Sequence, residues 1–137
     1  PKGDITEGMI ITLMPFYNYV NVLDIKGADL LEAFNVMAAD GGNGVSENVS
    51  ISYDPVKGKC EEVLINGVPL DPGRTYRLAT IDYLAKGGDY MSSLKRGTLV
   101  RKGRHVLYDD LIDEFRNGSL KGRLVNPSPE ARMKPID

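Results

Sequence analysis

Several residue types are scarce in this chain of 137 residues, and each shortage narrows what the chain can do. It holds one cysteine, Cys60, which excludes a disulfide within the chain and any multi-cysteine metal site. It also holds one histidine, His105. Metal-dependent phosphate hydrolysis uses two ions about 3.5–4 Å apart, and several His and Asp ligands are needed to hold them. We therefore expect no metal site and no catalytic residue in this chain.

A large excess of charge and a long apolar run are also missing. The 17 Lys and Arg residues nearly balance the 19 Asp and Glu residues, leaving a net charge of −2. A nucleic-acid polymer is bound through a basic surface, so this class of partner is not expected. No run approaches the ~18 apolar residues of a membrane span, and no signal peptide opens the sequence. A hydrophobic content of 42% is typical of a single packed domain of this length.

The spacing of apolar residues predicts an α+β fold with mixed, largely antiparallel sheets. Leu30, Phe34 and Met37 share one helical face, whereas Val49 and Ile51 alternate with serines as in a half-buried strand. Charged residues at 95–104 are expected in a solvated turn, and prolines leave the tail irregular. The predicted helices are a short one capped by Thr6 that runs through Met14, and those at 27–39 and 108–115, with a short helical turn at 90–94. The predicted strands cover 19–25, 49–53, 60–65, 75–81 and 98–101.

The stretch 83–89 combines an aromatic ring with a glycine pair and a carboxylate, directly after a predicted strand. Tyr83 offers a flat face, Asp89 offers two acceptor oxygens, and Gly87 and Gly88 let the backbone approach a ligand closely. A planar ligand that carries hydroxyl groups suits this combination. Ordinary turn chemistry is the alternative explanation of the same residues.

A second stretch, 15–18, places a ring and an amide at a break between two elements. Pro15 should end the preceding helix, because the residue before a proline is disfavoured in the α region. Phe16 and Asn18 are two apart, so in an extended segment they point to the same side. They are able to face one ligand together. The alternative is a core Phe beside a turn Asn.

Together with their surroundings, these stretches resemble the C-terminal domain of the 5'-nucleotidase / UDP-sugar hydrolase family. No single motif is specific, but the ordered set is. The matching motifs run in the family's order: GDIT at 3–6, PFYN at 15–18, KGADL at 26–30, SYDP at 52–55, INGVPLDP at 65–72 followed by Thr75 and Tyr76, and DYLAKGGD at 82–89.

This resemblance implies a layered α/β/β/α arrangement and a set of substrate-binding residues. Two aromatic rings sandwich the nucleobase in the family, which here implies Phe16 and Tyr83. Asn18 would contact the base and Asp89 the ribose hydroxyls, with Gly87 and Gly88 in the same loop. A family glycine that lines the base pocket has its nearest equivalent in Asn48. The sequence departs from the family at Tyr83, which is often Phe, at Ile81, commonly Asn, and at Tyr90, usually Gly.

The resemblance also implies a function and partners. The chain would be the substrate-recognition domain of a periplasmic or extracellular hydrolase that acts on nucleotide phosphoesters or UDP-sugars. A metallophosphatase domain, in cis or as a separate chain, would hold the divalent metal pair. We expect residues 1–137 to lack that domain and the N-terminal portion of this one, and to be inactive alone. The alternatives are a stand-alone nucleoside-binding or assembly module without catalysis, and an interaction domain that has lost its ligand.

Overall fold

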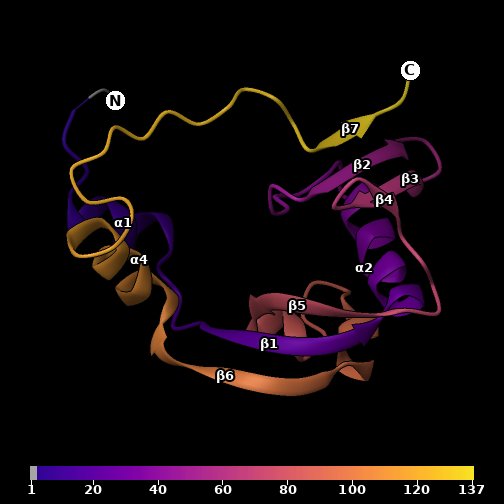
Figure 1. The fold of residues 1–137 in the computed structure, drawn as a ribbon, viewed down its shortest axis with the longest axis horizontal. Coiled ribbons are helices and arrows are strands. Elements are labelled where there is room, and N and C mark those ends of the chain that lie inside the picture. The colour runs from indigo at the N-terminus through magenta and orange to yellow at the C-terminus, as the bar shows by residue number, and fades with distance from the viewer. Residues whose placement is uncertain (1–2) are drawn as a thin grey trace.

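A computed structural model describes residues 3–137 and contains two β-sheets (Figure 1). In the first sheet, β1 (Tyr19–Lys26) lies between β5 (Thr75–Ile81) and β6 (Thr98–Val106), antiparallel to both. The second sheet has the order β4 (Val68–Pro69), β3 (Lys59–Ile65), β2 (Val49–Asp54) and β7 (Met133–Pro135). Its β2–β7 pair is parallel, whereas its other pairs are antiparallel. The predicted α+β class with mixed, largely antiparallel sheets is confirmed.

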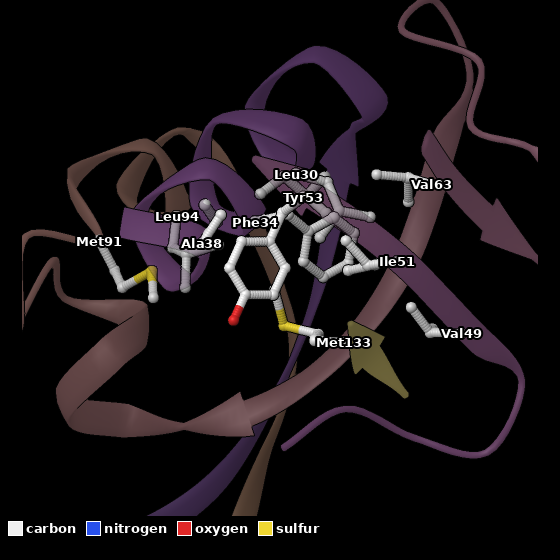
Figure 2. Packing of buried hydrophobic residues seen from close by; sticks show 12 residues of the cluster. Leu30, Phe34, Ala38, Val49, Ile51, Tyr53, Val63, Met91, Leu94 and Met133 are labelled. Carbon is white, nitrogen blue, oxygen red and sulfur yellow. The ribbon is translucent and has the colours of Figure 1, made fainter. Parts of the chain in front are cut away.

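Helix α2 (Gly27–Ala39) joins the two sheets through the hydrophobic core (Figure 2). Its buried residues Leu30, Phe34 and Ala38 belong to one cluster with Ile51 and Tyr53 of β2. The helix must begin at a glycine, because a Cβ atom at position 27 would lie 2.0 Å from the carbonyl oxygen of Asp71. Leu30 and Phe34 of the predicted apolar face are thus buried against β2.

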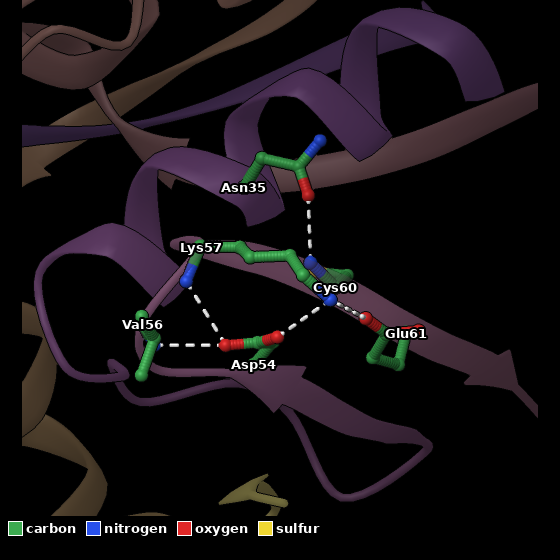
Figure 3. Close-up of polar contacts among 6 residues, drawn as sticks. All are labelled: Asn35, Asp54, Val56, Lys57, Cys60 and Glu61. Atoms are coloured by element: carbon green, nitrogen blue, oxygen red, sulfur yellow. Dashed lines mark hydrogen bonds and ion pairs between the residues drawn. The ribbon is translucent and has the colours of Figure 1, made fainter.

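The turn between β2 and β3 is held by a single carboxylate (Figure 3). The backbone N–H groups of Val56 and Lys57 donate to Asp54 Oδ1 at 2.8 and 2.9 Å, and Lys57 Nζ lies 2.9 Å from Asp54 Oδ2. Nearby, the Cys60 N–H donates to Asn35 Oδ1 at 2.8 Å, which ties β3 to α2. Burial raises the pKa of the Cys60 thiol to about 11, so the thiol stays protonated at neutral pH.

Helices α1 (Glu7–Leu13) and α4 (Leu107–Arg116) lie together, away from α2 (Figure 1). Thr6 caps α1 by accepting the Met9 N–H at 3.2 Å, as its position before the helix predicts. Arg116 forms an ion pair with Glu7 and so joins the two helices. No helix within residues 3–137 is long and apolar enough to cross a bilayer.

Three expectations about local structure are wrong. Tyr83 lies on a single helical turn, α3 (Asp82–Ala85), and not on an open loop. The charged residues 102–104 extend β6 instead of forming a turn, whereas Lys95 and Arg96 end a 3-10 helix, η1 (Ser92–Arg96), close to the helical turn expected at 90–94. The charged side chains within 102–104 stay in solvent because the strand lies at the edge of its sheet. The tail is not irregular throughout, since β7 pairs with β2.

Candidate functional site

The two rings singled out in the sequence belong to segments that adjoin the same end of the β1–β5 pair. Val20 of β1 pairs with Ile81 of β5, so the segment before β1, which holds Phe16, and the segment after β5, which holds Tyr83, both adjoin this end of the strand pair. The Tyr19 N–H donates to Asp82 Oδ1 at 3.1 Å and fixes α3 against the start of β1. Phe16 is 70% exposed and Tyr83 is 50% exposed. Neither ring fills the core, which removes the alternative that Phe16 is a core residue.

Tyr83, Gly88 and Asp89 form one contact unit. The Tyr83 hydroxyl donates to Asp89 Oδ1 at 3.1 Å. A Cβ atom at position 88 would lie 2.5 Å from Cε1 and Cζ of Tyr83 and 2.7 Å from Cε2. Three nearly equal distances place Gly88 against the face of the ring, and only glycine leaves room for that approach. The Gly88 N–H also donates to the Tyr83 carbonyl oxygen at 3.0 Å.

The backbone around Asp89 is left-handed at three positions. Gly87 has φ of 89°, Asp89 has φ of 50° and Tyr90 has φ of 62°. Asp tolerates this region better than most residues, whereas Tyr does not, so the loop is held in a costly conformation. Unusual backbone conformations of this kind concentrate where a side chain must be aimed at a ligand.

A cavity of about 720 Å³ lies beside this loop. Asp40, Asn43 and Gly44, which follow α2, line it together with Leu84 and Asp89. Its volume is in the range of small-molecule sites, about 300–1,000 Å³. Asp89 therefore borders a space large enough for a nucleoside-sized ligand. The other predicted site residues are not among those that line this cavity: Phe16, Asn18, Asn48, Tyr83, Gly87 and Gly88.

Asn18 and Asn48 occupy different surroundings. Asn18 is half-buried, and its carbonyl oxygen accepts the Leu107 N–H at 2.8 Å, which holds it at the start of β1. Asn48 lies beside the β3–β4 turn, where its Oδ1 accepts the Ser46 hydroxyl at 2.6 Å and its carbonyl oxygen accepts the Asn66 N–H at 2.8 Å. It is not among the residues that line the cavity beside Asp89. Its predicted contact with the base stays a prediction.

Asp89 is the predicted site residue that lines this cavity, and Asn43 and Gly44 are among the lining residues that the sequence did not indicate. They belong to the glycine-rich segment after α2, which has the sequence of a plain linker. The available signal was the glycine content itself, since closely spaced glycines allow a backbone to approach a ligand.

The titratable side chains do not fit a divalent metal pair. Within residues 3–137, no group of three or more His, Cys, Asp and Glu side chains is placed to hold a metal ion. The histidine, His105, is exposed at the end of β6, and its Nδ1 lies 3.1 Å from Asp110 Oδ1. This pair supplies fewer ligands than two metal ions require.

The sequence matches known proteins over most of its length. A family profile described as "5'-nucleotidase, C-terminal domain" matches residues 1–96. An apyrase from Tabanus yao is 32% identical over 137 residues, a match that covers 86% of this chain and 25% of that protein. Protein UshA from Escherichia coli K12 is 36% identical over 90 residues, covering 64% of this chain and 16% of that protein. The chain thus spans a quarter or less of the length of these relatives.

The fold matches a solved structure along the whole chain. The crystal structure of a 5'-nucleotidase precursor from Thermus thermophilus superposes with a TM-score of 0.82 and 27% sequence identity. This match covers 100% of the present chain and 29% of the Thermus chain. The arrangement of helices and sheets described above is therefore also found within a larger protein.

Proposed function

Since the chain belongs to the 5'-nucleotidase C-terminal domain family, we propose that it recognises the nucleoside part of the substrate in a nucleotide-hydrolysing enzyme. The observation that carries this proposal is the contact unit of Tyr83, Gly88 and Asp89, at the strand end to which Phe16 is also delivered. It offers an exposed ring next to a carboxylate, and these are the two groups that a heterocycle and its sugar require.

The nucleobase is proposed to stack between Phe16 and Tyr83, with Asn18 at its edge. Each contact between a base and an aromatic ring contributes roughly 1–3 kcal/mol. Asp89 accepts hydrogen bonds from the two ribose hydroxyls, because a carboxylate has acceptors only. The same negative charge repels a phosphate group. The sugar therefore lies against Asp89 and the phosphate points away from it.

The chemistry of hydrolysis is proposed to belong to another domain. The side chains of residues 3–137 do not fit a divalent metal pair. The pair is therefore proposed to lie in that other domain, where it would activate the attacking water. The bond broken is a nucleotide phosphoester or a UDP-sugar pyrophosphate. The metal-binding domain is proposed to lie in the same polypeptide or in a separate chain. The whole enzyme is proposed to be periplasmic or extracellular.

Titration of the chain with adenosine and uridine tests the proposed site. We expect Tyr83→Ala and Phe16→Ala each to weaken binding about tenfold or more, because each removes one stacking face. Tyr17→Ala is the matched control: Tyr17 is adjacent to Phe16, is 77% exposed, and packs edge-on against Tyr108 with ring centroids 6.1 Å apart. Isothermal titration calorimetry gives the affinities. Equal affinities for wild type and Tyr83→Ala would remove the ring from any role.

A further inference from the structure

The hydroxyl group of Tyr83 contacts the carboxylate that the proposed function assigns to ribose. Its oxygen lies 3.1 Å from Asp89 Oδ1. Stacking on a base needs only the ring, so this hydroxyl is not explained by stacking. We infer that the Tyr83 hydroxyl is a positioning group, which orients the Asp89 carboxylate for a vicinal diol and raises selectivity for ribose over sugars without that diol. This inference rests on the proposed function.

The ring and the loop are held so that the hydroxyl reaches one carboxylate oxygen. The face of the Tyr83 ring lies against Gly88, and the Gly88 N–H donates to the Tyr83 carbonyl oxygen at 3.0 Å. One ring face is thereby occupied by backbone, while half of the residue stays exposed. The hydroxyl extends from the end of the ring that covers Gly88 to the next residue, Asp89. Ring and carboxylate thus form one preorganised unit.

Asp89 depends on this contact for its orientation. Among residues 3–137, the Tyr83 hydroxyl is the hydrogen-bond donor found on the Asp89 carboxylate. Asp89 is exposed and its backbone is left-handed, with φ of 50°. Without the hydroxyl, the side chain would be free to rotate in solvent. Ribose binding would then have to fix the carboxylate as well as the sugar, and that ordering weakens binding.

The hydroxyl orients the carboxylate without blocking it. An ionised carboxylate has about four acceptor positions on its two oxygens. Tyr83 uses one position on Oδ1, which leaves the whole of Oδ2 and a further position on Oδ1. A vicinal diol donates two hydrogens, so a diol and the Tyr83 hydroxyl are able to bind together. The sign of the effect is therefore support for ribose, not competition with it.

Tyr83→Phe tests this inference, because it keeps the ring and removes only the hydroxyl. The wild-type chain, Tyr83→Phe and Tyr83→Ala are titrated with adenosine and with 2',3'-dideoxyadenosine. We expect Tyr83→Phe to weaken adenosine binding about threefold to tenfold, the range of one net hydrogen bond, and to change dideoxyadenosine binding less than about twofold. Asp89→Asn gives the loss when the charge itself is removed, and Tyr83→Phe should fall between it and wild type.

The possible results separate the inference from the proposed function. If Tyr83→Ala abolishes binding but Tyr83→Phe binds adenosine as wild type does, the ring matters and the positioning role of the hydroxyl is overturned. An equal loss for both ligands also overturns it, because the effect would then not pass through the sugar. Tighter adenosine binding by Tyr83→Phe would mean that the hydroxyl competes with ribose, which contradicts the inference. Failure of the wild-type chain to bind either ligand would overturn the proposed function and this inference together.

Discussion

Asp54 is the residue whose charge has the clearest consequence for stability. Hydrogen bonds from the Lys57 side chain and from the backbone of Lys57 and Val56 hold the pKa of the Asp54 carboxyl below its ordinary value (Figure 3). A carboxyl with a lowered pKa in the folded state stabilises that state above its unfolded pKa of about 3.9. This contribution is lost as the pH falls through the lower, folded value.

Asp54→Asn should therefore make the free energy of unfolding depend less on pH in the acid range. The amide oxygen still accepts the backbone N–H groups, so the variant removes mainly the charge. We expect it to be less stable than wild type near neutral pH and to lose less stability than wild type below about pH 4. Urea unfolding at several pH values measures this, with Glu47→Gln as an exposed control on the segment before β2. Parallel profiles for wild type and Asp54→Asn would contradict it.

For single residues, the sequence predicts the local backbone conformation better than it predicts which distant residues lie nearby. The local chain decides Gly27, Asn66 and Gly67: a helix begins at Gly27, as expected, and the Asn-Gly pair of the β3–β4 hairpin takes the positive φ of 54° and 74° that such a turn needs. The neighbours of Asn48, in contrast, are set by the β3–β4 turn far along the chain. No local pattern distinguishes Asn48 from Asn43, although the latter lines the cavity.

The formation of strand β7 depends on pairing with β2, a strand far away in the sequence. Its residues were expected to be irregular because the tail is rich in proline. The structure pairs Met133 with Ile51 of β2, and the Ile51 N–H donates to the Arg132 carbonyl oxygen at 2.8 Å. A strand of three residues has no periodicity to detect, so its pairing follows from the exposed edge of β2 and from the burial of Met133.

Truncating Met133 should show what this strand contributes. Met133 is 6% exposed, and its sulfur lies 3.4 Å from the backbone nitrogen of Asn43 in the segment that lines the cavity. We expect Met133→Ala to lower the free energy of unfolding by about 2–4 kcal/mol, because it leaves a cavity in the core. Leu124→Ala, in the same tail but 97% exposed, should change it by less than about 0.5 kcal/mol. Equal unfolding midpoints in urea for both variants would show that β7 is dispensable.

For the whole molecule, the order of elements was predictable and their arrangement was not. Hydrophobic spacing places most helices and strands, because each repeats its pattern over several residues. Apolar residues lie on both faces of β1, which is typical of an interior strand, and β1 is the central strand in the order β5–β1–β6. The second sheet depends on contacts between residues far apart in sequence, and its layering was expected only from the family resemblance.

The division of labour in the proposed function makes a prediction for the chain by itself. With Mn²⁺ or Zn²⁺, residues 1–137 should bind the nucleoside group of AMP or of a UDP-sugar, but release no phosphate from AMP and no UMP from the UDP-sugar above the background. The physical reason is that His105, beside Asp110, does not supply the ligands of a metal pair. Phosphate release and nucleoside affinity are measured on the same preparation, with Tyr83→Ala as the binding control and His105→Ala as the metal control.

Turnover that follows the chain through purification and disappears in both variants would contradict this division, because one chain would then hold both substrate and metals. Turnover that is unchanged in both variants would identify a contaminating enzyme. Binding without turnover, lost only in Tyr83→Ala, agrees with a recognition domain whose chemistry lies elsewhere. The two variants change different strands, since Tyr83 follows β5, His105 lies in β6, and β1 lies between these two strands.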